Sequence, residues 1–354
     1  MENLALEFDW VQALNVTQNS TVLFRADSSA GIGSGHIMRC LTLAEELREN
    51  SKAIRFICRE LPGNMIENIE THGFEVLRLP LGLETDSWQV DAEQTREILL
   101  RNRLKPDWLV VDNYDLDKGW ESALRPFVGR IMVIDDQANR EHDCDLILDQ
   151  NYYQNMGRRY QGLVPQGARQ LLGPKYALLR REFRIARQQL PNRDGSVRRI
   201  LVFYGGSDPT NETAKALEAI GLLNRPDITV DVVVGAANSN RGLIKEVCFD
   251  MVNTKFYCQV NNMAELMVRA DLALGAGGTA TWERCYVGLP ALITVVAANQ
   301  RETVEALAEA GVVSNIGWHE EVSVDELVES LKALLNSLDQ LREMALRGIA
   351  LFEG

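Results

Sequence analysis

The sequence predicts an α/β protein with two Rossmann-like, doubly wound domains and a cleft between them. Two observations lead to this prediction. The chain has 354 residues, which at roughly 100–200 residues per domain suits two domains of similar size. Short apolar segments also alternate with helical patterns, and this alternation occurs twice along the chain. Hydrophobic residues make up 46% of the sequence and charged residues 25%, proportions typical of a soluble globular protein.

The first alternating series lies between residues 21 and 150. Several of its strand-like segments are nearly continuous apolar runs, as expected for strands buried on both faces of a parallel sheet. Residues 36–50 form the clearest helical stretch, because Ile37, Leu41 and Ala44 recur at helical spacing. The predicted strands are 21–26, 53–59, 74–80, 108–113, 130–136 and 144–150.

The second series begins near residue 198. Helical patterns at 211–223 and 299–311 lie between its strands, and a periodic helical segment at 323–352 follows them without recognisable chemistry. The predicted strands are 198–206, 228–235, 254–260, 271–277, 290–296 and 312–317.

These patterns divide the chain into four parts. Residues 1–20 form an N-terminal extension, expected to be a short amphipathic or disordered lead. Residues 21–172 form the first domain, 173–197 a linker, and 198–354 the second domain. The linker combines an Arg-rich helical pattern with the helix breakers Pro191 to Gly195. Ligands of open α/β sheets bind beyond the carboxyl ends of the strands, so a cleft facing those ends is the expected site.

Charge and composition argue against several classes of function. The 37 basic and 50 acidic residues give a net charge of −13, which disfavours binding to nucleic acid or to an anionic membrane. A small anion held by backbone amides is not excluded. No apolar run reaches the roughly 20 residues of a membrane helix, and the N-terminus lacks the basic region of a secretory signal. The six cysteines are scattered without metal-ligand spacing. We therefore expect a reduced, cytoplasmic protein without a metal site.

A glycine-rich loop at 28–35 connects the first predicted strand to a helix that His36 opens. Such glycines let the backbone approach a ligand, and a helix N-terminus offers unpaired N–H groups to an anion. The spacing GxGxGH departs from the dinucleotide fingerprint GxGxxG. A neutral imidazole at this position is a candidate proton acceptor. Alternatively, His36 merely caps the helix or pairs with a carboxylate such as Asp27. The remaining histidines, at 72, 142 and 319, are expected at the surface.

Two similar loops follow strands in the second half. Gly205 and Ser207 lie in the first, where Ser207 or Asp208 is a plausible helix N-cap. The second contains Gly277, Gly278 and Thr279. Together the two loops could wrap a diphosphate with amides and hydroxyls instead of basic side chains. Glu283, one turn into the next helix, could accept two ribose hydroxyls. Tight turns with ordinary capping are the alternative explanation.

Five segments together resemble the PseG family. They are 25–47, 133–153, 173–183, 204–213 and 275–300; they occur in family order, and the likeness runs from about residue 21 to 320. Members of this family hydrolyse UDP-2,4-diacetamido-2,4,6-trideoxy-β-L-altropyranose in pseudaminic acid synthesis, and they are related in fold to GT-B glycosyltransferases such as MurG. The chain departs from the family pattern at Ala298, where an acidic residue often stands, and at Ala280, which interrupts a run of hydroxyls.

The resemblance implies a metal-independent hydrolysis without a cofactor, in which water attacks the anomeric carbon and inverts it. His36 matches the family's proposed base. The resemblance further implies that Asp27, Arg39 and the amides of Gly33–Gly35 shape the floor of the acceptor side. In the second domain it implies that the 275–279 loop and Glu283 bind uridine and ribose. The resemblance also matches Asn299 and Gln300 to a polar pair that lies near the sugar or phosphate in the family, and Arg180 to an arginine that contacts the nucleotide there.

Two other functions remain open at this point. A GT-B glycosyltransferase would pass the sugar to an acceptor hydroxyl, and would need an open acceptor groove with an apolar or basic patch that the first half lacks. A nucleotide-sugar sensor would bind without turnover, and would have no need of a base at His36. The oligomeric state and the stereochemistry of the sugar do not follow from the sequence.

Overall fold

The computed structural model describes residues 8–29, 31–81 and 87–353. They form two compact units divided between Leu178 and Leu179, with Tyr152–Gln154 grouped with the second unit. The predicted linker 173–197 spans this division and contains a helix of its own, α6 (Arg181–Arg187). Its Arg-rich pattern therefore belongs to the second unit. Of the predicted N-terminal extension, residues 1–7 lie outside the described part of the chain.

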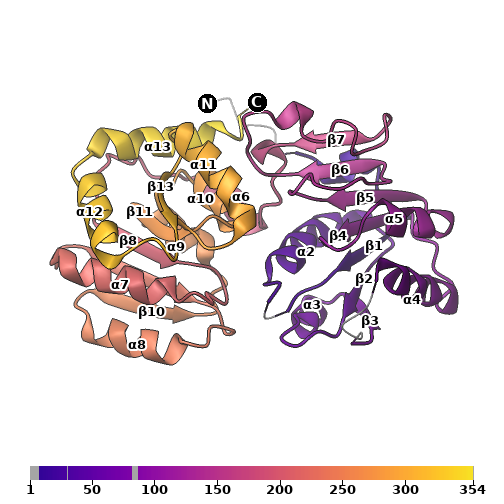
Figure 1. Ribbon diagram of the computed structural model, residues 1–354, viewed down its shortest axis with the longest axis horizontal. Helices are drawn as coiled ribbons and strands as arrows, with labels where there is room; N and C mark the ends of the chain where they lie inside the picture. Colours follow the sequence, from indigo (N-terminus) through magenta and orange to yellow (C-terminus); the bar gives the residue numbers. More distant parts are fainter. Residues whose placement is uncertain (1–7, 30, 82–86, 354) are drawn as a thin grey trace. The chain divides into compact units, whose positions relative to one another are not determined.

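The first unit contains a seven-stranded, wholly parallel sheet in the order β3-β2-β1-β4-β5-β6-β7 (Figure 1). All six predicted strands are present. A seventh, β7, was not predicted, because this short edge strand is half exposed and has no apolar run. The strands are β1 (Thr21–Ala26), β2 (Ala53–Arg59), β3 (Glu75–Leu79), β4 (Trp108–Asp112), β5 (Arg130–Ile134), β6 (Leu146–Asp149) and β7 (Arg169–Leu172).

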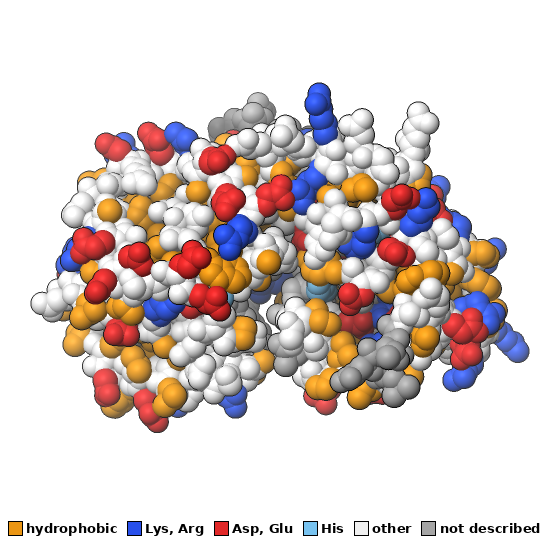
Figure 2. All heavy atoms as spheres, in the orientation of Figure 1, with side chains coloured by type: hydrophobic (Ala, Val, Ile, Leu, Met, Phe, Trp, Pro, Cys, Tyr) orange, Lys and Arg blue, Asp and Glu red, His pale blue; other side chains and the backbone are white. Residues whose placement is uncertain are grey.

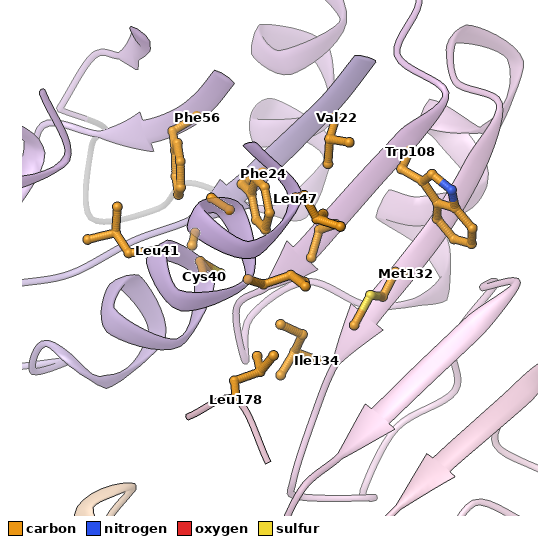
Figure 3. Close-up of a cluster of buried hydrophobic side chains, with 14 of the residues drawn as sticks. Val22, Phe24, Cys40, Leu41, Leu47, Phe56, Trp108, Met132, Ile134 and Leu178 are labelled. Carbon is orange, nitrogen blue, oxygen red and sulfur yellow. The ribbon is translucent and has the colours of Figure 1, made fainter. Parts of the chain in front are cut away.

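Helices cover both faces of this sheet. They are α1 (Trp10–Ala13), α2 (Gly35–Leu47), α3 (Ile66–Thr71), α4 (Trp88–Arg101) and α5 (Lys118–Leu124). Alternate residues of each strand face opposite helices. Phe24 of β1 packs with Cys40 and Leu47 of α2 (Figure 3), in a core that also includes α3, whereas Leu23 packs with α4 and α5. This two-sided burial explains why the strands are continuous apolar runs in the sequence.

The N-terminal segment belongs to the first of these cores. Trp10 and Leu14 are buried against β1, β4 and α2, and the Leu14 carbonyl accepts a hydrogen bond of 2.7 Å from the Trp108 indole. Asp9 caps α1 by accepting from the Gln12 amide. The described part of the predicted extension is therefore ordered and packed, in contrast to the expected disordered or amphipathic lead.

The second unit contains a six-stranded parallel sheet in the order β10-β9-β8-β11-β12-β13 (Figure 1). Each strand matches a predicted one. They are β8 (Arg199–Phe203), β9 (Thr229–Val234), β10 (Thr254–Cys258), β11 (Leu272–Ala276), β12 (Ala291–Val295) and β13 (Ser314–Trp318). The helices after α6 are α7 (Glu212–Leu223), α8 (Arg241–Asp250), α9 (Met263–Arg269), α10 (Ala280–Tyr286), α11 (Arg301–Glu309), α12 (Val324–Leu335) and α13 (Leu338–Ala350).

One face of this sheet packs against α7, α8, α12 and α13 around residues such as Val202 and Leu331. Helices α9, α10 and α11 contact β8, β11 and β12, respectively. In both units the second and third strands are added on one side of the first strand, and the fourth strand is added on its other side. The strand order therefore reverses between β1 and β4, and again between β8 and β11. Such reversal points are where open α/β sheets bind ligands.

Three surface properties bear on function. Lys and Arg side chains lie scattered among Asp and Glu on the face that Figure 2 shows. Within the described ranges, no helix is long and apolar enough to cross a membrane. All six cysteines are free thiols, and Cys258 is the exposed one.

Candidate active site

His36 and Asp112 meet at the strand reversal of the first unit. His36 is the second residue of α2, which follows β1, and Asp112 is the last residue of β4, the neighbouring strand. His36 Nδ1 lies 2.5 Å from Asp112 Oδ1. Contact with an ionised carboxylate at this distance requires a proton on Nδ1, so we assign the lone pair of the neutral ring to Nε2. The carboxylate thereby orients an imidazole that can accept a proton.

Arg39, one turn further along α2, holds the same carboxylate. Its Nε lies 2.5 Å from Asp112 Oδ2 and its Nη2 2.6 Å from Oδ1. Burial would raise the pKa of Asp112, but Arg39 and His36 outweigh it and hold this pKa well below its usual range. Asp112 therefore stays ionised and keeps its hydrogen bond with the imidazole over the range in which an enzyme works.

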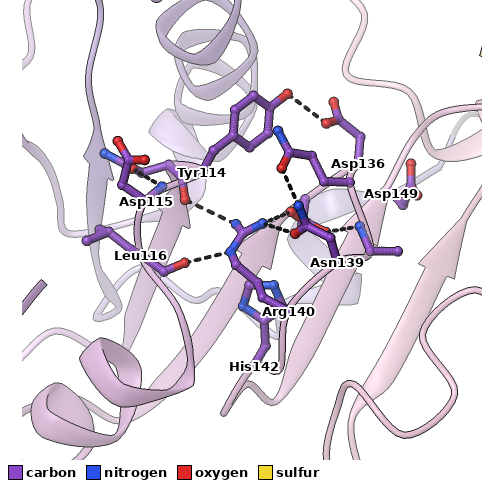
Figure 4. Close-up of polar contacts among 12 residues, drawn as sticks. Tyr114, Asp115, Leu116, Asp136, Asn139, Arg140, His142 and Asp149 are labelled. Atoms are coloured by element: carbon purple, nitrogen blue, oxygen red, sulfur yellow. Dashed lines mark hydrogen bonds and ion pairs between the residues drawn. The ribbon is translucent and has the colours of Figure 1, made fainter. Parts of the chain in front are cut away.

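Tyr114 closes the other side of the imidazole. Its ring meets that of His36 edge to face, with centroids 4.6 Å apart, and its hydroxyl donates to Asp136 Oδ1 at 2.6 Å (Figure 4). Asp136 also accepts from Arg39 Nη1 at 3.0 Å. His36 is thus fixed by a carboxylate at one edge and an aromatic ring on another, and 9% of its side chain remains exposed.

Asp149 extends this acidic row to the end of β6. Burial and the nearby Asp136 raise the pKa of Asp149 to about 7, although Arg159 Nε approaches within 3.1 Å and the Tyr160 hydroxyl within 3.2 Å. Figure 4 shows Asp149 on the far side of Asp136 from Tyr114. The carboxyl ends of β4, β5 and β6 thus form a continuous polar edge.

The glycine loop itself leaves space at two positions. Gly33 has a φ of +84°, a conformation that favours glycine, and a Cβ at Gly33 or Gly35 would meet nothing within 4 Å. Asp27 directly follows β1, and its carboxylate is held by the Arg25 guanidinium and the Arg59 amide, each at 2.7 Å. His36 does pair with a carboxylate, as one alternative expected, but that carboxylate is Asp112 and not Asp27. A role for Asp27 in substrate binding stays a prediction.

In the second unit, the loop after β8 is partly closed by its own carboxylate. Asp208 is buried at a φ of +41° and accepts from the amides of Glu212 and Thr213 at 3.0 and 2.9 Å. The N-cap position of α7 is Asn211 and not Ser207 or Asp208 as predicted. The Asp208 side chain nevertheless caps the helix from three residues earlier, and it occupies the first-turn amides that were expected to be open to an anion. Gly205, with a φ of +97° and open space at its Cβ position, and the half-buried Ser207 remain available.

In the loop after β11, Gln300 holds the backbone. Its Oε1 accepts from the amides of Gly277 and Val296, each at 3.2 Å. A Cβ at Gly277 would come 2.3 Å from Val304 Cγ2, so this glycine serves close packing and its amide is already used. That differs from the expectation that Gly277 donates to phosphate. Gly278, Thr279 and the exposed Asn299 remain the candidates of this loop.

Arg180 and Glu283, predicted separately as nucleotide-contacting residues, are brought together. Arg180 Nε lies 2.9 Å from Glu283 Oε1, and Arg180 Nη1 lies 2.7 Å from Glu182 Oε1. Glu283 keeps 15% of its side chain exposed. The ion pair orients Glu283 while its second oxygen can still accept a hydrogen bond.

Sequence reasoning missed several residues of the first unit. Asp112, Tyr114 and Asp136 are absent from the predicted site, although the signal was present: the apolar runs ending at 112, 134 and 149 are each followed or closed by an aspartate. His142 was expected at the surface but is buried, with Nδ1 2.7 Å from Glu121 Oε1. Within the described residues, no group of three or more His, Cys, Asp or Glu is placed to hold a metal ion.

Comparison with known structures and domains defines the class of the protein. Residues 199–351 match the glycosyltransferase family 28 C-terminal domain. The MurG structure from Acinetobacter baumannii is similar with a TM-score of 0.64 at 12% identity over 94% of both chains. UDP-GlcNAc 2-epimerase from Neisseria meningitidis, bound to UDP-GlcNAc, gives 0.58 at 14% identity over 92% of this chain and 94% of that one. The chain has the GT-B fold, which confirms the predicted fold class.

Relatives with curated names narrow this class. UDP-2,4-diacetamido-2,4,6-trideoxy-beta-L-altropyranose hydrolase of Campylobacter jejuni is 26% identical over 82% of this chain and 97% of its own length. Spore coat polysaccharide biosynthesis protein SpsG of Bacillus subtilis is 26% identical over 88% of each chain. MJ1062 of Methanocaldococcus jannaschii is 27% identical over an aligned region that covers 78% of this chain and 56% of that protein's length. The chain is thus homologous to the Campylobacter hydrolase, in line with the resemblance that its motifs predicted.

Proposed function

We propose that this protein hydrolyses a UDP-linked diacetamido-trideoxy sugar to UDP and the free sugar, with inversion at the anomeric carbon, in pseudaminic acid biosynthesis. The observation that carries the proposal is the His36–Asp112 pair, with Nδ1 bound at 2.5 Å and Nε2 left to accept a proton. The similarity to the Campylobacter hydrolase over nearly its whole length supports the substrate class. Ligand binding alone needs no oriented base.

In the proposed reaction, His36 Nε2 takes a proton from water as the water oxygen attacks the anomeric carbon. The bond between that carbon and the β-phosphate oxygen breaks, and UDP leaves with the electron pair. Asp112 stabilises the imidazolium that forms and keeps the ring oriented. General-base catalysis of this kind contributes about 10²–10⁴-fold. The proton then passes from His36 to solvent.

The second unit would bind the UDP moiety. Glu283 would accept the ribose hydroxyls while Arg180 holds it in place. Gly205, Ser207, Gly278 and Thr279 would donate to the diphosphate, since the first-turn amides of α7 and the Gly277 amide have internal acceptors. Amide donors stabilise the charge that develops on the leaving phosphate, and they explain how a protein of charge −13 can bind an anion.

The test is a panel of UDP-sugars incubated with the protein in the presence of EDTA. UDP release is followed by a coupled assay, and NMR identifies the first anomer formed. We expect release from diacetamido-trideoxy sugars with inversion, and at least about 10²-fold slower release by His36→Ala. Retention of configuration, or wild-type rates in His36→Ala, would contradict the proposed mechanism. Binding of these sugars without turnover would instead indicate a sensor.

A second candidate function is a glycosyltransferase that uses a sugar acceptor. The match of residues 199–351 to the glycosyltransferase family 28 C-terminal domain favours it. His36 would then deprotonate an acceptor hydroxyl instead of water. UDP release that begins only when a hydroxyl acceptor is added, with the sugar recovered on that acceptor, distinguishes it from the hydrolase.

A further inference from the structure

Arg284 of α10 is a buried arginine surrounded by neutral partners. It is 2% exposed, and its Nη2 donates to the Ala276 carbonyl at 2.6 Å and to Thr281 Oγ1 at 2.9 Å. Its Nε is buried without a hydrogen-bond partner. The adjacent Glu283 pairs with Arg180 instead, and in the described ranges no carboxylate forms an ion pair with Arg284.

Buried arginines of the first unit are compensated in the usual way. Arg25 pairs with Asp27 and Asp91 at 2.7 and 2.6 Å, and Arg39 pairs with Asp112 and Asp136. A buried charge without a partner is costly and is retained where something else compensates it. Burial lowers the pKa of Arg284 to about 10, so its guanidinium is still charged at neutral pH.

The position of this charge points to its counter-ion. A Cβ at Gly275 would lie 2.7 Å from Arg284 Nη1 and 2.4 Å from the Phe203 carbonyl, and Gly275 pairs with Phe203 across β11 and β8. The guanidinium therefore lies beside the ends of the two strands where the order of the second sheet reverses. Both candidate diphosphate loops begin there, at Tyr204 and Gly277, directly after β8 and β11.

We propose that Arg284 is the positioning residue of the nucleotide site, whose buried charge fixes the 275–279 loop and is balanced by the diphosphate of the ligand across that loop. The inference rests on the proposed function. By holding the Ala276 carbonyl inward at 2.6 Å, Arg284 restrains the loop from which Gly278 and Thr279 would donate. The positive charge of Arg284 also attracts the diphosphate of UDP, an interaction that uridine lacks because it has no phosphate.

The sharpest test places a counter-ion inside the protein. Thr281→Asp puts a carboxylate beside Arg284 Nη2, and Thr281→Asn puts a neutral group of the same size there. Binding of UDP and of uridine is measured by calorimetry for wild type and both variants. We expect Thr281→Asp to weaken UDP binding about tenfold with uridine binding within twofold of wild type. Thr281→Asn should weaken neither ligand beyond about twofold.

A second pair of variants makes the test independent of how Thr281→Asp folds. Arg284→Met should lose about tenfold in UDP affinity and little in uridine affinity, and Arg284→Lys should recover most of the UDP affinity. Equal losses for UDP and uridine, or identical behaviour of the Asp and Asn variants, would overturn the inference and indicate a purely structural arginine. Wild-type protein that binds no UDP would contradict the proposed function itself.

Discussion

The Asp112 carboxylate bridges His36 and Arg39 through both of its oxygens: Oδ1 lies 2.5 Å from His36 Nδ1, and Oδ2 lies 2.5 Å from Arg39 Nε. His36 and Arg39, which donate these hydrogen bonds, lie on successive turns of α2, and the accepting Asp112 ends β4. The tautomer and orientation of His36 thus depend on a residue of a neighbouring strand.

Replacing Asp112 by Asn should therefore impair catalysis without removing the histidine. We expect Asp112→Asn to lower kcat for the proposed hydrolysis by about 10²-fold, because the amide no longer fixes the Nδ1–H tautomer. KM should change less, since the nucleotide would bind in the other unit. Asp107→Asn, at the opposite end of β4, is the matched control and should keep kcat. Equal losses in both variants would point to damage to the strand.

Asp149 should make the first unit less stable as the pH rises. Its folded pKa of about 7 lies above the ordinary value of 3.8, so between these two values the folded state holds a proton that the unfolded chain has released. Stability therefore falls with pH in this window. In Asp149→Asn, the free energy of unfolding relative to wild type should rise by about 3 kcal/mol between pH 5 and 8, as measured by urea titration. A pH-independent difference would disprove the assignment.

Asp91 provides the control with the opposite sign. Despite burial, Arg25 and Arg59 lower the pKa of Asp91 to about 2, so its stabilising contribution is full above 3.8 and is lost as the pH falls toward 2. Asp91→Asn should destabilise the protein at pH 7, and the difference from wild type should shrink at acid pH.

Gly277 and Gly278 offer a matched pair for the nucleotide loop. Gly277→Ala brings a Cβ to 2.3 Å from Val304 Cγ2, whereas Gly278→Ala meets no atom closer than Gln300 Nε2 at 3.8 Å. We expect Gly277→Ala to destabilise the second unit by about 1–3 kcal/mol and Gly278→Ala to have a smaller effect, as read from thermal unfolding. Adding Val304→Ala should recover part of the loss. Equal effects of the two single changes would show that the close packing at Gly277 is unimportant.

Asp208 should act as the cap of α7 and not as a ligand. Asp208→Ala removes the acceptor for two first-turn amides and places alanine at a positive φ, so we expect a loss of about 1–2 kcal/mol in unfolding free energy. Asp208→Asn keeps an acceptor and suits the left-handed conformation, so its loss should be smaller. A larger loss for Asn than for Ala would contradict the capping role.

Glu283 should distinguish ribose from deoxyribose. If it accepts ribose hydroxyls, Glu283→Ala weakens UDP binding by about tenfold or more and leaves 2′,3′-dideoxy-UDP unaffected. Glu182→Ala, which removes the other carboxylate bound to Arg180, is the control and should not alter the ratio between the two ligands. Calorimetry with both nucleotides measures the ratio of their affinities. If Glu283→Ala leaves this ratio unchanged, Glu283 does not recognise the ribose hydroxyls.

Much of the fold could be predicted because its signals are local. Continuous apolar runs such as 108–112 reflect strands with helices on both faces, and glycine-rich loops mark the turns that follow. Strand β7 lacked that signal, because its Arg169 and Gln170 are exposed at the sheet edge.

The partners of the site residues could not be predicted, because they depend on strand order. Asp112 is 76 residues from His36 in the chain, and only the pairing of β4 beside β1 brings them together. The same holds for Gln300, which comes from beyond β12 to bind the Gly277 amide. The capping of α7 by Asp208, by contrast, involves residues close in the chain, and ordinary capping was one of the two explanations that we considered for this loop from the sequence.

The burial of Trp10 changes what counts as the first unit. Its indole is 1% exposed within the same core as Phe24, so a fragment beginning at Thr21 would lose a large interior side chain together with Leu14 and would expose the Trp108 face of the sheet to water. Loss of a buried aromatic typically costs several kcal/mol, a large part of the stability of a domain. A truncation chosen from sequence similarity alone, which starts near residue 21, would therefore cut into the interior and should yield aggregated protein.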